Sequence, residues 1–218
     1  MRTIGDFQDD LQRALAWRKR EVGGIRASVR RSKADKCPAV RGGLVLLYSH
    51  WEGFLKESVQ HYIDFVFSQN LKIEKLTPNF VAIAYFSDVV EAAKATYPGS
   101  ELNHLKLARR LLQGTSVICN QGSWRVDTGG DAGSETYQRL MNSIGVSFDL
   151  GMDRATWEAT RVFIDEHLAR DRHRIAHGQG FYISKQDLLD RAIRLTALQD
   201  RLLSSLVAAA SAKQYETI

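Results

Sequence analysis

The chain has 218 residues and a mass of 24.6 kDa, of which 44% are hydrophobic, 25% are charged and only 3 residues are Pro. This length fits one folded domain, and the composition is too apolar for a disordered chain and too charged for a membrane protein. No run approaches the ~20 apolar residues that cross a bilayer, and the charged beginning does not resemble a secretory signal. Cys37 and Cys119 form no paired motif, which argues against a disulfide framework. We therefore expect a cytoplasmic globular protein.

The positive charge of the chain is unevenly distributed. The formal net charge is +5, but residues 1–41 hold 11 basic and 5 acidic side chains, which leaves 19 basic and 20 acidic side chains for the rest. A basic segment of this kind attracts polyphosphates such as nucleic acid, although solvated helical faces often have the same composition. Charge alone leaves both interpretations open.

The first half of the chain predicts long helices. Apolar side chains recur at helical spacing over residues 4–36 and again over 40–68, where the stripe is wide enough to indicate a buried helix. Thr77-Pro78 is a helix start, because Thr caps free amides and Pro suits the first turn, and this helix is expected to reach about Thr96.

The middle of the chain is less regular. Pro98-Gly99 should end the preceding helix, and residues 115–126 are compatible with either a short strand or an irregular link. Between them we expect a shorter helix over 101–112, whose inward side chains are Leu102, Leu105 and Leu112.

The second half predicts a loop and three further helices. Residues 127–134 are rich in glycine but lack the Gly-Lys-Ser/Thr ending of a phosphate-binding loop, so a flexible loop is expected. Ser184 and Asp187 form a potential capping box, and the short turn before them predicts that the last two helices fold back antiparallel. These helices are expected over 135–144, 153–176 and 184–212. The sequence thus predicts an all-α protein with one domain over 1–218.

One segment departs from ordinary helix composition. Residues 167–178 end a predicted helix and crowd together histidines and arginines: His167, Arg170, Arg172, His173, Arg174 and His177, followed by Gly178. Cations favour the negative carboxyl end of a helix, and Gly is a common helix stop, so a structural explanation exists. It accounts for arginine better than for several histidines. Histidine exchanges a proton near neutral pH and arginine holds phosphate oxygens, so together they suit phosphodiester chemistry.

The spacing of these residues constrains their geometry. On a regular helix Arg172 and His177 point ~140° apart, so they flank a groove rather than form one tight pair. Arg170, Arg174 and His177 share a face and would line the same groove with positive charge. A metal site on His173 and His177 is the competing interpretation, but a third ligand is missing and the arginines would repel a dication. A Cys or Ser nucleophile is not favoured either, because no strand-turn-helix elbow is present.

Two motifs resemble those of the HEPN superfamily of helical prokaryotic nucleases. Arg172-His-Arg-Ile-Ala-His177-Gly is similar to its R-x4-6-H signature, and Tyr48-Ser-His-Trp-Glu-Gly-Phe-Leu-Lys56 is similar to the "hWEgfxK" stretch of the MAE-type branch, which lies close to the RiboL-PSP group. The resemblance implies an all-α HEPN-like bundle with long antiparallel helices. It also implies a homodimeric ribonuclease in which both copies contribute Arg172 and His177 to one cleft. Arg170 also satisfies the wider spacing of the signature.

The resemblance further implies a metal-independent endoribonuclease with no cofactor. His177 would take the proton of the RNA 2′-hydroxyl, and Arg172 would hold the phosphate, with Arg170 and Arg174 as further phosphate contacts and His173 in support. Look-alikes are toxins of toxin–antitoxin or phage-defence loci, so an antitoxin protein is an expected partner.

Other hypotheses stay open at this point. Glu52 is either a surface partner of Lys56, worth only ~0.3 to 0.5 kcal/mol, or a carboxylate that orients Arg172 or a histidine. Tyr48 and Trp51 lie on the apolar stripe and are expected in the core. For the whole protein, the alternatives are a catalytically silent HEPN module that binds RNA or a nucleotide, and a helical adaptor.

Overall fold

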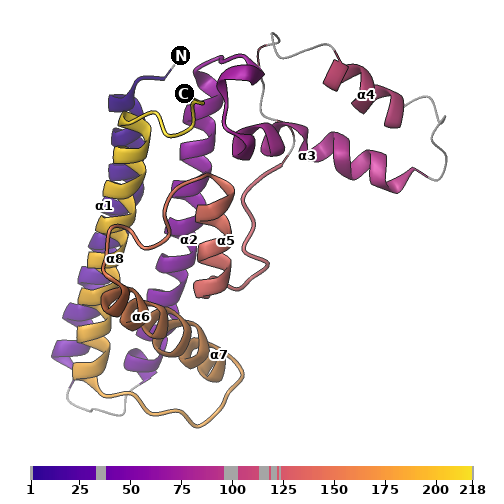
Figure 1. Ribbon diagram of the computed structural model, residues 1–218. Helices are drawn as coiled ribbons and strands as arrows, with labels where there is room; N and C mark the ends of the chain where they lie inside the picture. Colours follow the sequence, from indigo (N-terminus) through magenta and orange to yellow (C-terminus); the bar gives the residue numbers. More distant parts are fainter. Residues whose placement is uncertain are drawn as a thin grey trace.

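The computed structural model is built from helices (Figure 1). It describes residues 2–32, 38–95, 103–112, 118, 122 and 124–217. Within these ranges there are two isolated β-bridges and no strand, so the predicted all-α class is confirmed. No helix in this part of the chain combines the length and apolar character needed to span a membrane.

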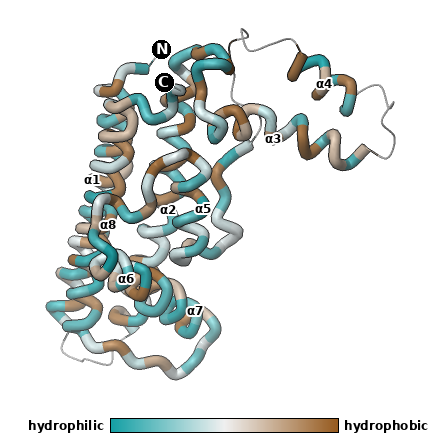
Figure 2. The backbone as a smooth tube through the Cα atoms, in the orientation of Figure 1, coloured by the Kyte–Doolittle hydropathy of each residue, from teal (hydrophilic) through white to brown (hydrophobic). Residues whose placement is uncertain are grey.

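Three long helices form the body of the molecule and run side by side (Figure 1). They are α1 (Ile4–Arg31), α2 (Pro38–Ser68) and α8 (Lys185–Ser211), with α1 antiparallel to the other two. The apolar stripe of α2 is so wide that most of this helix is enclosed, and apolar residues recur along its whole length in Figure 2. Its largest fully buried side chains include Tyr48, Trp51, Phe54, Tyr62 and Phe65.

The ends of the long helices follow local capping chemistry. The predicted Ser184–Asp187 capping box is present at the start of α8. Helix α3 (Pro78–Lys94) has Pro in its first turn as predicted, but the Thr77 side chain makes no capping hydrogen bond. The first helix ends at Arg31, and the rest of the range predicted for it lies outside the described residues.

Helices α3 and α4 (His104–Leu112) project from the body as an arm (Figure 1). The prediction that Leu105 and Leu112 face inward is wrong, because they are 41% and 85% exposed. The physical reason is that α4 packs on α3, partly through an ion pair of Arg110 with Asp88, and that none of its residues is buried in the described structure. Leu102, Pro98-Gly99 and most of the predicted link over 115–126 lie outside the described residues.

The helix predicted over 153–176 is continuous but not uniformly α-helical. It comprises α6 (Arg154–Val162), a π-helical segment (Phe163–Arg170) and α7 (Asp171–Ala176). It crosses the lower half of the bundle obliquely and meets α8 at Arg191 and Arg194, instead of lying antiparallel along it as expected. The neighbours of α8 along its length are α1 and α2. Helix α5 (Ser134–Ser143) forms as predicted.

Gly43 of α2 lies close to side chains of α1 and α8. A Cβ atom there would lie 2.8 Å from Leu188 Cδ2 and 3.0 Å from Ile25 Cγ2, whereas a Cβ at the adjacent Gly42 meets nothing within 4 Å. We expect Gly43→Ala to lower the free energy of unfolding by ~1–3 kcal/mol through overpacking, and Gly42→Ala to raise it by ~0.5–1 kcal/mol through helix propensity. Urea unfolding measures both. Equal effects of the two substitutions on the free energy of unfolding would contradict the close packing of Leu188 and Ile25 against Gly43.

Burial lowers the pKa of His50 and His167 below their ordinary value of 6.5, with Arg191 acting in the same direction on His167 and Glu21 opposing it at His50. The unfolded chain therefore binds protons more readily at these two sites. Above pH 6.5 these two histidines should not change the free energy of unfolding. As the pH falls from 6.5 to the lower pKa values of the folded state, we expect the free energy of unfolding to decrease. Urea titrations across this range measure the decrease, which should be shallower in His50→Gln. Stability that rises on acidification would refute the prediction.

Candidate active site at the end of α7

The cationic segment ends in a Schellman motif. The Gln179 N–H donates to Arg174 O at 2.9 Å, the Gly178 N–H donates to Ile175 O at 3.1 Å, and Gly178 has a φ of +70°. These two bonds satisfy carbonyls that would otherwise lack partners, and the positive φ explains why glycine follows the last helical turn. The helix therefore stops at His177, which is exposed.

Arg172 is directed into the molecule, onto the long helix α2. Its guanidinium carbon lies 4.1 Å from the centre of the Tyr48 ring, and its Nη2 donates to Gly130 O at 3.2 Å. Among the described residues, no carboxylate oxygen lies within 4.0 Å of this guanidinium. The positive charge of Arg172 is thus held in place by a π face and a carbonyl without being neutralised.

The other two arginines of the segment have different environments. Arg170 forms an ion pair with Glu166, one turn earlier on the same helix. Arg174 lies over the Phe181 ring, 4.6 Å from its centre, and 3.9 Å from a carboxylate oxygen of Asp171. Arg172 therefore differs from both neighbours in having no acidic partner in the described structure.

A pocket of about 400 Å³ opens beside Arg172. It lies between α2, the loop over 130–133 and the helix that carries the cationic segment. Of the predicted site residues it brings together Arg170, Arg172 and His173. Its full lining is Tyr48, Gly130, Asp131, Gly133, Asp165, Ala169, Arg170, Arg172 and His173.

His177 is not part of the pocket lining and lies beside His173. Their ring centres are 4.1 Å apart with an interplanar angle of 48°, and both side chains are exposed. Arg172 and His177 thus point in different directions, as the helical spacing predicted. Within the described residues no third His, Cys, Asp or Glu joins the two imidazoles to form a group that could hold a metal ion.

The glycine-rich loop over 127–134 is bound to α2 by side chains of the Tyr48–Lys56 motif. The Ala132 N–H donates to Tyr48 Oη at 2.8 Å, and Trp51 Nε1 donates to Ala132 O at 2.7 Å. Both aromatic side chains are buried as predicted. Burial raises the pKa of the Tyr48 hydroxyl, which accepts rather than donates in this contact. The two motifs therefore meet directly, where Arg172 lies over Tyr48, and through the loop, whose Gly130 accepts from Arg172.

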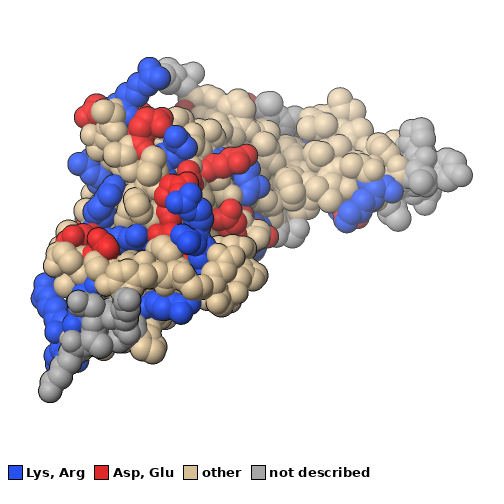
Figure 3. All heavy atoms as spheres, turned by 90° about the horizontal axis from the view of Figure 1, so that it is seen from below, with Lys and Arg blue, Asp and Glu red and all other residues tan. Residues whose placement is uncertain are grey.

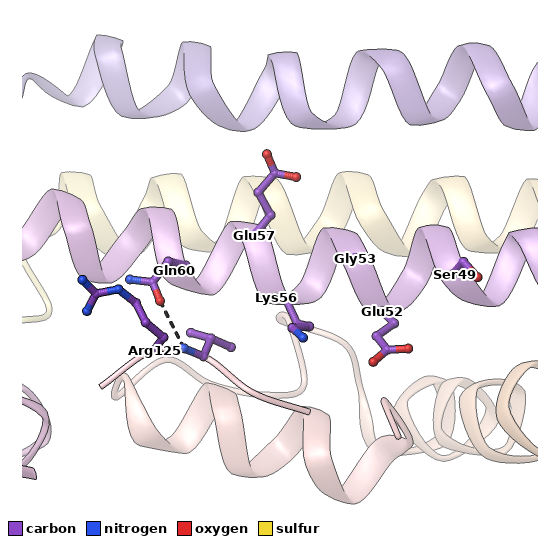
Figure 4. Close-up of a pocket in the computed structure, with 8 residues that line it drawn as sticks. Ser49, Glu52, Gly53, Lys56, Glu57, Gln60 and Arg125 are labelled. Carbon is purple, nitrogen blue, oxygen red and sulfur yellow. Dashed lines mark hydrogen bonds between the residues drawn. The ribbon is translucent and has the colours of Figure 1, made fainter. Parts of the chain in front are cut away.

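Glu52 belongs to the same set of contacts. Its Oε1 accepts a hydrogen bond from Thr128 Oγ1 at 2.6 Å, so it anchors the loop that contacts Arg172. Lys56, the alternative partner, instead has its Nζ 3.9 Å from Asp127 Oδ1. Figure 4 shows Glu52 and Lys56 directed toward this loop, at one side of an open groove of about 560 Å³ along α2.

Two acidic residues that the sequence analysis did not single out hold the site together. Asp165 accepts from the Ser134 N–H at 2.7 Å and from Ser134 Oγ at 2.6 Å, at the start of α5. Asp171 is buried and accepts from Arg191 Nη1 at 2.7 Å, and the same Arg191 nitrogen donates to His167 O at 2.7 Å. The sequence signalled Asp171 only as an acidic residue within the cationic segment. It did not indicate the partner, Arg191, which lies 20 positions later.

The comparisons with known proteins are consistent with these motifs. No curated protein and no solved structure shows significant similarity to the chain. A family model described as MAE_28990-like HEPN matches residues 7–215, which include most of α1, all of α2 and α8, the loop and the cationic segment. The chain therefore belongs to the MAE_28990-like HEPN family.

Proposed function

We propose that the protein is a metal-independent endoribonuclease whose site is the pocket beside Arg172. HEPN domains are often ribonucleases, although some members lack catalysis. The observation that carries the proposal is the guanidinium of Arg172, which lies over Tyr48 with no ion-pair partner among the described residues and lines a pocket together with His173, whose ring centre lies 4.1 Å from that of His177. A fixed positive charge next to imidazoles is what phosphodiester cleavage requires.

The reaction uses the 2′-hydroxyl of RNA as the nucleophile. The His177 imidazole takes the hydroxyl proton, the 2′-oxygen forms a bond to the adjacent phosphorus, and the bond from phosphorus to the 5′-oxygen breaks. The leaving 5′-oxygen takes up a proton, for which the neighbouring His173 is a suitable donor, and a 2′,3′-cyclic phosphate is left. Arg172 binds the phosphate and stabilises the charge that grows on its oxygens. DNA lacks the nucleophile and is not cut.

The proposed assembly is a homodimer with a composite site. In one copy Arg172 faces α2 while His177 is exposed at the end of α7, so a single chain does not enclose a phosphate between them. A second copy packed against this end would supply the opposite wall. We expect the active species to be a dimer in solution.

Cleavage assays with purified protein test the reaction. We expect RNA cleavage in EDTA, products ending in a cyclic phosphate, no cleavage of DNA of the same sequence, and loss of cleavage in His177→Ala. Activity that appears only when a divalent ion is added would overturn the mechanism. Tight RNA binding without cleavage at neutral pH would identify a silent binding module instead.

We also propose the biological role of a toxin that an antitoxin protein restrains. Endoribonuclease activity on cellular RNA would arrest growth of a bacterial host, and His177→Ala would relieve the arrest. Expression of both forms at matched levels, followed by mapping of RNA 5′ ends, tests this role. If the native chain and the variant permit equal growth, the toxin role is rejected.

A further inference from the structure

The excess positive charge of the first 41 residues gathers at one end of the bundle. From Arg2 to Lys19 the cations are paired: Arg2 and Arg13 pair with Asp10, Arg18 pairs with Glu57, and Lys19 pairs with Asp200. Further along, the described residues contain cations with no carboxylate oxygen within 4.0 Å: Arg20, Arg26, Arg30, Arg31 and Arg41. The surplus therefore lies toward the end of α1 and the start of α2.

This end of the bundle is continuous with the candidate active site. Arg41 Nη2 donates to Gln179 O at 3.0 Å, and Gln179 is two residues beyond His177. Lys185, at the start of α8, donates to Ser32 O at the end of α1. The connection over 178–184 thus runs from the histidines to the exposed Arg30 and Arg31, across the lower end of the molecule.

Figure 3 views the molecule from this end and shows Lys and Arg side chains gathered at its lower left corner. The acidic side chains nearby are already engaged. Asp187 caps the first turn of α8, and Asp171 is paired with Arg191. Among the described residues, no carboxylate forms an ion pair with Arg30, Arg31 or Arg41.

Aromatic side chains lie along the same connection. Tyr182 is 53% exposed, and Phe181 lies beneath the guanidinium of Arg174. Surfaces that bind single-stranded nucleic acid combine cations for the phosphates with aromatic rings on which bases stack. Single-stranded RNA is favoured over a membrane surface or an acidic protein because this end is joined to the candidate active site through the contact of Arg41 with Gln179.

We propose that this basic end, formed by Arg30, Arg31, Arg41, Arg174 and Tyr182, binds the single strand of RNA that extends from the cleaved phosphodiester. The inference rests on the proposed function, because the strand is the continuation of a substrate bound at His177. Apart from Arg174, which belongs to the second motif, the residues of the basic end lie outside the two motifs and the pocket. The role of Arg30 and Arg31 is affinity for long substrates, because they lie at the other end of the connection from His177.

The test measures binding separately from cleavage. Fluorescence anisotropy measures the binding of a labelled 20-nucleotide oligouridylate at several salt concentrations. Two proteins are compared: the His177→Ala variant, and the same variant with Arg30→Ala/Arg31→Ala added. We expect the double substitution to weaken binding about tenfold at low salt and to reduce the slope of log affinity against log salt by ~1.4, or ~0.7 for each lost phosphate contact. Both side chains are exposed, so the fold should persist.

A matched control removes two cations from the opposite end of α2. Lys72 and Lys75 are exposed and follow α2, whose 31 residues separate them from the basic end by roughly 45 Å. Lys72→Ala/Lys75→Ala should leave affinity and salt slope unchanged. Equal losses in the two double variants would overturn the proposal, because they would indicate a response to net charge alone.

A second arm separates this inference from the proposed function. In protein with native His177, the Arg30→Ala/Arg31→Ala change should lower kcat/KM for the 20-mer about tenfold and leave kcat/KM for the dinucleotide UpA unchanged. If the native chain cuts no RNA but binding depends on Arg30 and Arg31, the proposed function fails and the binding surface stands. If the chain cuts RNA but its affinity for RNA is the same with and without Arg30 and Arg31, only the proposed RNA-binding role of the basic end is rejected. Binding of phosphatidylserine vesicles through these residues, without binding of the oligouridylate, also rejects it.

Discussion

Arg172→Ala is expected to lower the rate of RNA cleavage by ~10²–10³-fold, the effect of removing one preorganised donor from the charge that develops in a transition state. Arg170→Ala is expected to cost less than about fivefold, because its guanidinium is already paired with Glu166 and exposed. Single-turnover cleavage of a short RNA under saturating enzyme measures both. The two positions each satisfy the spacing of the HEPN signature, so the structure rather than the motif makes this distinction.

Two controls make the comparison decisive. Arg172→Lys keeps the charge but loses the planar group that stacks on Tyr48, so it should recover only a small part of the rate. The free energy of unfolding in urea should be similar for Arg170→Ala and Arg172→Ala if Arg172→Ala lowers the cleavage rate by affecting the reaction and not the stability of the fold. A larger loss of cleavage at Arg170 than at Arg172 would reverse the assignment.

Asp171→Ala is expected to lower the free energy of unfolding by about 3 kcal/mol or more. Asp171 is 5% exposed and accepts from Arg191, which is itself largely buried, so the substitution leaves an unpaired cation between α7 and α8. The cost arises from that stranded charge more than from the lost hydrogen bond. Urea unfolding followed by circular dichroism measures it.

The double variant Asp171→Leu/Arg191→Met serves as the control for the stranded charge. Because a buried ion pair is often replaced by apolar residues at little cost, this variant should recover most of the lost stability. Arg174→Ala should change the free energy of unfolding by less than about 0.5 kcal/mol, because Arg174 is closer to the surface and 3.9 Å from the same carboxylate. Equal effects of Asp171→Ala and Arg174→Ala would contradict the buried pair.

The relationship between the two motifs is clearer in the structure than in the sequence. The sequence analysis left Glu52 with two possible partners, a nearby lysine or the catalytic side chains. In the structure its carboxylate binds Thr128 instead, while Tyr48 and Trp51 hold Ala132. The first motif thus contacts Arg172 directly through the Tyr48 ring, and also through a loop whose Gly130 carbonyl accepts from Arg172. Spacing along one helix contains no information about a loop more than 70 residues away.

The long helices were predictable because their signals are local. Apolar spacing, the capping box of Ser184 and the glycine after His177 each depend on residues within a turn or two of one another. The same kind of reasoning predicted that Arg172 and His177 point in different directions. It was wrong for Leu105 and Leu112, because a helical stripe shows which side chains share a face but not whether another element covers that face.

By itself, the sequence determined the helical class, the positions of the main helices and the two motifs. Only the tertiary structure decided which arginine has no ion-pair partner among the described residues, that Asp165 binds the start of α5 and Asp171 binds Arg191, and that Arg41 contacts Gln179. Propensity and spacing act between near neighbours in the chain. Charge pairing and burial depend on side chains brought together from distant segments, and for these the order of residues specifies no partner until the chain has folded.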